Sequence, residues 1–219
     1  MRAVALGYDI CARLTMSLNA YEFREDGHST HSFGPMFGAA AAAASLLRLD
    51  EAKVRYVLSY SAQQASGISC WMRDEEHIEK AFDFGGMPAR NGVSAATMVA
   101  HGFTGVEDAL SGERSFYVAY GRDPKPEVLV QGLGEDYEIL RTNIKRWSVG
   151  SPIQAPLDSL ALLVVRGVES HRAVEQHHRA HVLHADVGHV PVVRGVRALV
   201  RHAHHHFLDL VGFQPVLDE

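Results

Sequence analysis

The sequence predicts a mainly α-helical protein: a helical bundle followed by the start of a smaller α+β domain. Three observations carry this prediction. Apolar residues recur at helical spacing through most of residues 1–134, and a run of six alanines extends from Ala39 to Ala44. Alternation of apolar and polar residues, the pattern of a strand, comes later, over residues 137–147. The first two patterns predict closely packed helices, and the third predicts a strand.

Composition excludes several classes of protein. With 219 residues and 47% hydrophobic content, the chain can bury a core. Its net charge of -5 argues against nucleic acid or an anionic membrane surface as a partner. No apolar stretch is long enough to cross a membrane, and the first residues do not resemble a signal peptide. Cys11 and Cys70 are expected to be reduced thiols, so a cytoplasmic location is predicted.

The helices of the first half are predicted from spacing and end signals. Apolar positions predict helices over residues 2–18 and 35–48, separated by a polar loop over 19–33. Pro35 suits the first turn of the second helix. Asp50 is the expected N-cap of a third helix, which Gly67 ends.

The second half is expected to be less regular. A short helix is predicted over residues 74–82, and the sequence Phe-Gly-Gly-Met-Pro that begins at Phe84 is predicted to break the chain before a helix that starts at Pro88. Two further short helices are predicted over 106–110 and 113–120. The strand over 137–147 is followed by Ser151, the expected cap of a helix from 152 to about 165.

The composition changes abruptly near Gly167. Ten of the 14 histidines follow residue 170, and no lysine follows Lys145. We therefore divide the chain into a partial helical domain (1–134), the start of an α+β lid (135–167) and an aberrant histidine-rich tail (168–219). The preferred hypothesis is that the tail is a frameshifted, poorly packed translation without a selected function.

A metal site is the alternative for the tail. Three of its histidines share one helical face, His177, His181 and His184, and residues 202–206 read HAHHH. Imidazoles bind zinc or nickel, but a specific site needs defined supporting residues, and no cysteine accompanies these histidines. The sequence therefore predicts adventitious binding and no functional metal site.

Four stretches in order show a resemblance to a known family. The opening helix AVALGYDICARL is followed by HSFGPMFGAAAAAASLLRLDEAKVRYVLSYSAQQASG, then by FGGMPARNGVSAATMVAHGFTGVEDALSG and IKRWSVGSPIQAPLDSL. Over residues 3–165 the chain resembles the MmgE/PrpD family, which includes 2-methylcitrate dehydratase, cis-aconitate decarboxylase and iminodisuccinate epimerase. The resemblance implies an all-helical domain, an α+β lid with the active site between them, a homodimer, and no metal or organic cofactor. It also implies a fragment that lacks the N-terminal helices and most of the lid.

The resemblance also points to site residues. The family places a histidine just before the small-residue helix, which leaves His28, the first choice, and His31 as catalytic candidates. A family lysine before the Gly-rich turn corresponds to Lys80, and another before the lid helix corresponds to Lys145. Arg90 is a third candidate for binding substrate. Histidine can transfer a proton near neutral pH, and fixed cations hold substrate carboxylates.

The function implied is dehydration or decarboxylation of a small polycarboxylate such as 2-methylcitrate or cis-aconitate. An isomerase or epimerase on a similar acid is the first alternative, because the same proton abstraction serves both reactions. A non-catalytic helical interaction module is the second. Little or no activity is expected of this chain, since the family's Asp/Thr/His cluster and lid tyrosine have no counterpart in it, so the sequence leaves open whether this chain is an enzyme.

Overall fold

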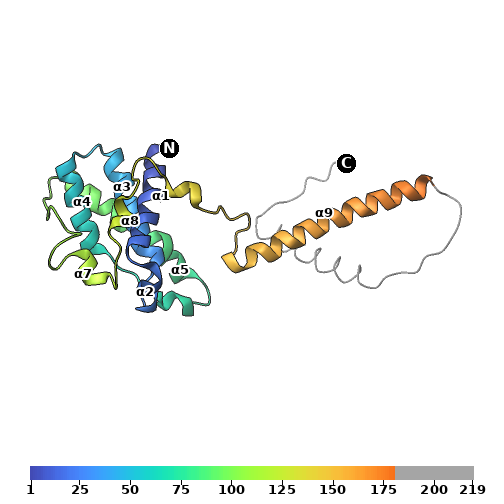
Figure 1. Cartoon of the computed structure of the whole chain (residues 1–219), viewed down its shortest axis with the longest axis horizontal. Coiled ribbons are helices and arrows are strands. Elements are labelled where there is room, and N and C mark those ends of the chain that lie inside the picture. Colours follow the sequence, from blue (N-terminus) through green and yellow to red (C-terminus); the bar gives the residue numbers. More distant parts are fainter. Residues whose placement is uncertain (181–219) are drawn as a thin grey trace. The chain divides into compact units, whose positions relative to one another are not determined.

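A computed structural model describes the backbone of residues 1–180 and the side chains of residues 1–167. The chain divides into two units between Ile144 and Lys145, and each is described by itself. The first unit is a bundle of helices (Figure 1). Residues 1–180 contain no named strand; one isolated antiparallel bridge pairs His28 with Ile68. The mainly helical fold predicted from the sequence is confirmed.

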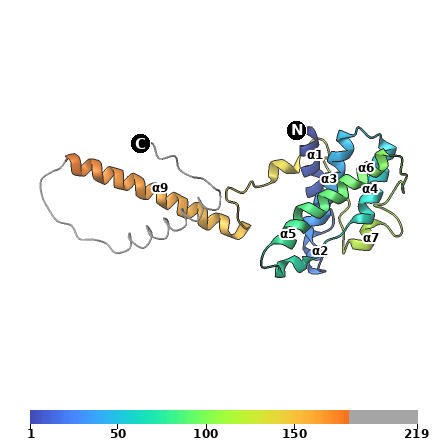
Figure 2. The same cartoon turned by 180° about the vertical axis from the view of Figure 1, so that it is seen from behind.

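Helix α3 (Thr30–Leu46) forms the centre of the first unit. It packs against α1 (Arg2–Ser17) and against α6 (Met87–Ala100), as Figure 2 shows from behind. Glycines allow both close approaches: a Cβ on Gly38 would overlap the Gly7 carbonyl of α1, and one on Gly92 would overlap the backbone of α3. The small-residue run therefore serves helix packing, as its composition predicts.

Helix α4 (Glu51–Gln64) completes the bundle. The predicted cap is present, since the Lys53 backbone N–H donates to Asp50 Oδ1 at 2.9 Å. Apolar side chains form two buried clusters. One lies among α3, α4 and α6 and comprises Ala40, Ala44, Val57, Ala95, Ala96 and Val99. The other lies against α1 and comprises Leu14, Leu18, Phe23, Phe33, Met36, Phe37, Ala65, Phe116 and Tyr117.

The predicted loop over residues 19–33 is wrong. The short helix α2 (Ala20–Glu25) forms there, and α3 already begins at Thr30, so Pro35 is its sixth residue and not in its first turn. Burial explains the difference. Phe23 is almost completely buried and meets Phe33 edge to face, with ring centroids 4.8 Å apart. This apolar contact outweighs the polar composition of the segment.

The predicted break at Phe84 is also wrong. After η1 (Ser69–Arg73) and α5 (Ile78–Ala81), the π-helical turn η2 (Phe82–Gly86) leads directly into α6. The wider turn accommodates both glycines without ending the helix. The helix predicted over 106–110 is absent, because Asp108 instead accepts the N–H groups of Leu110 and Ser111 in a turn. Only α7 (Phe116–Tyr120) forms in that region.

The predicted strand over residues 137–147 does not form. After α8 (Glu127–Val130), the segment makes a single 3-10 turn, η3 (Glu138–Arg141). A strand needs a neighbour to pair its backbone groups, and residues 1–180 offer no strand edge. The Glu138 N–H donates instead to Asp9 on α1, at 2.7 Å. The start of the α+β lid is therefore not visible.

The second unit is described as far as residue 180. Helix α9 (Ser151–Ala180) extends beyond the predicted end near 165. The segment before it folds back onto its first turns, where Trp147 Nε1 donates to Asp158 at 2.9 Å. The predictions for the histidine-rich tail concern side chains outside the described residues. They comprise the frameshift and the metal alternative at His177, His181 and His184. No helix in the described part is long and apolar enough to cross a membrane.

Candidate functional site

Backbone hydrogen bonds fix the loop that precedes α3. The Ser29 N–H donates to the Gly67 carbonyl at 3.0 Å, and the Ser69 N–H donates to the Gly27 carbonyl at 2.8 Å. Ser69 Oγ adds a bond to the His28 carbonyl, also at 2.8 Å. This loop, residues 26–29, is called the histidine loop; it is tied to the segment after α4 and carries His28, and His31 follows as the second residue of α3.

His28 is half-buried within a cluster of aromatic rings. Its imidazole stacks on Phe23, with centroids 4.5 Å apart and planes at 22°. It meets Phe33 and Tyr120 edge to face, each at 5.8 Å. These contacts fix the orientation of the ring in apolar surroundings.

His31 occupies a different environment, beside the lysine predicted to bind substrate. Its exposed ring stacks on Phe84 at 3.9 Å with planes at 3°, and it meets Trp71 edge to face at 5.7 Å. Lys80 Nζ lies 5.5 Å from the Phe84 centroid and 5.6 Å from the Trp71 centroid. His31 and Lys80 thus share the same two rings, and we call these four residues the His31–Lys80 cluster.

Trp71 contributes an unsatisfied donor to this cluster. Its indole Nε1 is buried, and among the described residues it has no hydrogen-bond partner. Buried indole N–H groups usually find an acceptor. The sequence pattern does not single out Trp71, and it marks Phe84 only as part of a predicted helix break. Their positions follow from the folding of η1 and η2 against α3, which apolar spacing does not reveal.

A second polar pair ties the same segments together. Asp83 lies in η2 and is 5% exposed, and Ser29 Oγ donates to its Oδ2 at 2.5 Å. Burial raises the pKa of the Asp83 carboxyl above its usual value near 3.8. The Ser29 hydrogen bond opposes this rise in pKa, and nearby Glu79 adds to it. The sequence analysis did not identify this pair.

The other predicted cations lie elsewhere. Arg90 is exposed near the start of α6; its guanidinium lies 5.8 Å from the Phe82 ring, and its Nε donates to Asn91 Oδ1 at 3.1 Å. Lys145 is exposed and belongs to the second unit. The structure brings together His31 and Lys80, and the roles of Arg90 and Lys145 stay predictions.

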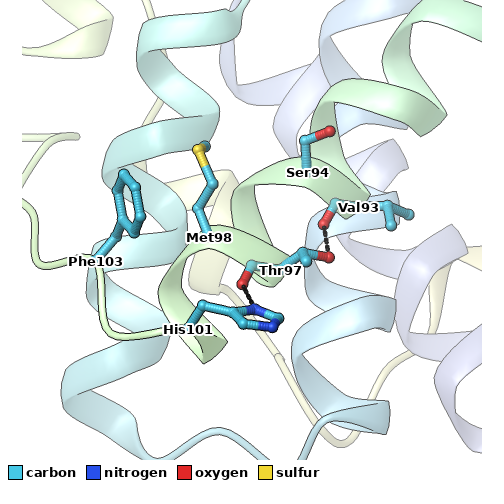
Figure 3. Close-up of a pocket in the computed structure, with 6 residues that line it drawn as sticks. All are labelled: Val93, Ser94, Thr97, Met98, His101 and Phe103. Carbon is cyan, nitrogen blue, oxygen red and sulfur yellow. Dashed lines mark hydrogen bonds between the residues drawn. The ribbon is translucent and has the colours of Figure 1, made fainter.

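A pocket of about 380 Å³ lies along the second half of α6 (Figure 3). It is lined mainly by apolar atoms, and two of its polar side chains already have hydrogen-bond partners. His101 Nδ1 lies 2.8 Å from the Thr97 carbonyl, and Thr97 Oγ1 donates to the Val93 carbonyl at 2.8 Å. A second pocket, of about 350 Å³, borders Tyr120 and Phe116. Neither pocket includes a predicted site residue.

Metal binding has no candidate in the part of the chain that the structure describes. No group of three or more histidine, cysteine, aspartate or glutamate side chains is arranged there to hold an ion. The titratable groups near α3 are imidazole, ammonium and carboxyl groups. These groups can transfer a proton and bind an anion.

Comparison with known proteins identifies the family of the helical unit. A model of the MmgE/PrpD N-terminal domain matches residues 1–129, which include α1 to α7, the histidine loop and the His31–Lys80 cluster. A search of curated proteins found no match. Because the family model covers more than half of the 219 residues, the chain belongs to the MmgE/PrpD family.

Proposed function

We propose that the protein acts as a cofactor-independent lyase on a small polycarboxylate such as 2-methylcitrate or cis-aconitate. One observation carries this proposal: His31 and Lys80, from separate helices, lie against the same two aromatic rings. A proton-transfer group and a cation thereby contact the same pair of rings. Membership of the MmgE/PrpD family supports the same chemistry.

The reaction needs only these two kinds of group. The Lys80 ammonium binds a substrate carboxylate, and the apolar rings around it strengthen that attraction by excluding water. In a dehydration, an imidazole takes the proton next to the carboxylate, the C–H electron pair forms the double bond, and hydroxide leaves as water after protonation. In a decarboxylation, the carbon–carboxylate bond breaks, carbon dioxide leaves, and the electron pair left on carbon takes a proton from an imidazolium.

Different observations support each of the two histidines as the group that transfers the proton. The resemblance favours His28, whose ring is fixed among Phe23, Phe33 and Tyr120. The geometry favours His31, because its ring stacks on Phe84, over which the Lys80 ammonium also lies. We propose both histidines as proton-transfer groups, and Arg90 and Lys145 each stay candidates for binding a carboxylate. We also propose that the protein is cytoplasmic and forms a homodimer. Light scattering on the purified chain would test the homodimer.

Deuterium exchange tests the proposal directly. The full chain is incubated in D₂O with 2-methylcitrate or cis-aconitate, and proton NMR follows the hydrogen next to the carboxylate. Exchange is a partial reaction, so it detects proton transfer even where turnover is slow, as we expect here. The expected result is exchange that His28→Asn or His31→Asn abolishes, whereas His101→Asn, a change at the exposed histidine that directly follows α6, has no effect.

The reaction products distinguish a lyase from an epimerase. A lyase forms a new carbon–carbon double bond together with water or carbon dioxide. Inversion at the exchanging carbon without a new double bond would replace the lyase with an epimerase. No exchange of 2-methylcitrate above the buffer rate, together with no release of carbon dioxide from cis-aconitate, would overturn the proposal and leave a helical interaction module.

A further inference from the structure

Asp83 occupies an unusual turn between two residues of the His31–Lys80 cluster. The π-helical turn η2 is wider than an α-helical one, and such turns are rare and are found frequently at functional sites. Lys80 precedes Asp83 in sequence, and Phe84 follows it directly. The His31 ring stacks on Phe84, and the Lys80 ammonium lies over the rings of Phe84 and Trp71. The Asp83 side chain is instead buried, so this turn carries a polar group into the protein.

Ser29, the partner of Asp83, gives up its usual role. It is the N-cap residue of α3, where a serine side chain normally accepts a backbone N–H of the first turn. No such bond is present, and its hydroxyl donates to Asp83 Oδ2 at 2.5 Å. Ser29 is 1% exposed and lies between His28 and His31 in sequence. The bond therefore joins the histidine loop to the turn next to Lys80.

A third segment closes around this bond. Gly67 has a φ of +126°, and a Cβ there would overlap the Ser32 side chain and lie 2.8 Å from Asp83 Oδ1. Ser32 Oγ donates to the Ser66 carbonyl at 2.7 Å and to the Ser29 carbonyl at 3.1 Å. The histidine loop, the segment after α4 and η2 thus meet at one buried point.

We propose that Asp83 and Ser29 are positioning residues. Their hydrogen bond sets the position of the histidine loop relative to the turn that follows Lys80, and we call this relative position the register. In this way His31 and Lys80 reach the same pair of rings, although they come from elements about 50 residues apart in sequence. The inference rests on the proposed function for the choice of substrate. The register itself exists without substrate, so it can be measured separately.

The ring protons of His31 in the ligand-free protein report this register. Stacking on Phe84 moves their NMR signals upfield, and comparison with the His31→Asn spectrum assigns them. Ser29→Ala and Asp83→Ala are expected to move these signals toward those of an unstacked histidine, and the double variant is expected to move them no further. Asp83→Asn is expected to restore the native signals, because its amide oxygen still accepts the Ser29 hydroxyl.

Ser61→Ala is the matched control, since the Ser61 hydroxyl is also buried but has no hydrogen-bond partner among the described residues. Native His31 signals in Ser29→Ala would overturn the inference, and so would signals in Asp83→Asn that match those of Asp83→Ala. If Asp83→Ala fails to fold, Ser29→Ala and Asp83→Asn decide the question.

Substrate binding separates this inference from the proposed function. Ser29→Ala is expected to weaken cis-aconitate binding about tenfold, because His31 and Lys80 are then no longer held against the same rings. Absence of binding by the unaltered chain would overturn the proposed function, whereas the His31 signals would still decide the positioning role. Native binding together with displaced His31 signals would show that the register does not serve the substrate and would overturn the functional part of the inference.

Discussion

At the scale of single residues, one buried ion pair holds the end of the helical unit. Arg13 Nε donates to Asp9 Oδ2 at 2.8 Å, and both side chains are 2% exposed. The Arg13 guanidinium also donates to the carbonyls of Gln131 and Asp136, each at 2.5 Å. Because the polar atoms of the pair are satisfied by backbone groups, it anchors residues 128–138 on α1.

We expect Arg13→Met to lower the free energy of unfolding by about 3–5 kcal/mol, because it leaves the Asp9 carboxylate buried without a counter-charge. The control is Arg55→Met. Arg55 forms an ion pair with Glu51 at the same four-residue spacing, but both side chains are exposed. Its loss is expected to leave the free energy of unfolding almost unchanged, because solvent screens an exposed pair. Urea unfolding measures both values, and equal losses would contradict the anchoring role.

Asp83 gives a prediction about pH. Burial raises the pKa of its carboxyl above 3.8, so the folded protein holds the proton more tightly than the unfolded chain does. The associated stability is complete below pH 3.8 and is lost as the pH rises through the folded pKa. The Asp83→Asn side chain does not titrate, so the variant does not lose this stability. The free energy of unfolding of the variant, relative to that of the unaltered protein, should therefore increase from pH 3.8 to neutrality. Urea unfolding across this range tests the sign, and a constant difference would refute it.

At the scale of elements, the approach of α6 to α3 depends on a missing side chain. A Cβ on Gly92 would lie 2.7 Å from the Ala40 nitrogen and even closer to the Met36 carbonyl, and neither backbone atom can move alone. We expect Gly92→Ala to destabilise the protein by about 1–3 kcal/mol. Gly85→Ala is the control, because no atom lies within 4 Å of its added Cβ. Thermal unfolding compares the two, and a stable Gly92→Ala protein would contradict this packing.

The elements also show what could be predicted from sequence. The four long helices of the bundle follow from apolar spacing, and the start of α4 follows from Asp50. The polar segment before α3 was misjudged because one buried residue, Phe23, makes it helical. The segment over 137–147 alternates like a strand but has no partner strand in the described structure. Periodicity describes one segment at a time, whereas pairing depends on distant residues.

Some residues of the candidate site could likewise be predicted from the sequence, and others could not. His28, His31 and Lys80 could be selected from the resemblance, because they are polar residues beside recognisable motifs. The rings that bring His31 and Lys80 together come from Trp71 and Phe84, and their placement depends on the turn at η2. Asp83 became a candidate only when its burial and its bond to Ser29 were visible.

At the scale of the whole molecule, the helical unit contains its own core. Both buried apolar clusters and the Asp9–Arg13 anchor lie within residues 1–144, and the family match ends at residue 129. We therefore expect residues 1–144, expressed alone, to unfold in one cooperative transition at the same midpoint as this unit in the full chain. Calorimetric melting tests this, and a broad transition or a much lower midpoint would show that the second unit supports the bundle.

Titration calorimetry with cis-aconitate tests most directly the claim that the His31–Lys80 cluster binds a small polycarboxylate. The full chain is compared with Lys80→Met and with Lys53→Met, which removes an exposed lysine on α4. We predict measurable binding by the full chain, about tenfold weaker binding by Lys80→Met, and unchanged binding by Lys53→Met. No binding by the full chain, or equal binding by the two lysine variants, would contradict the assignment.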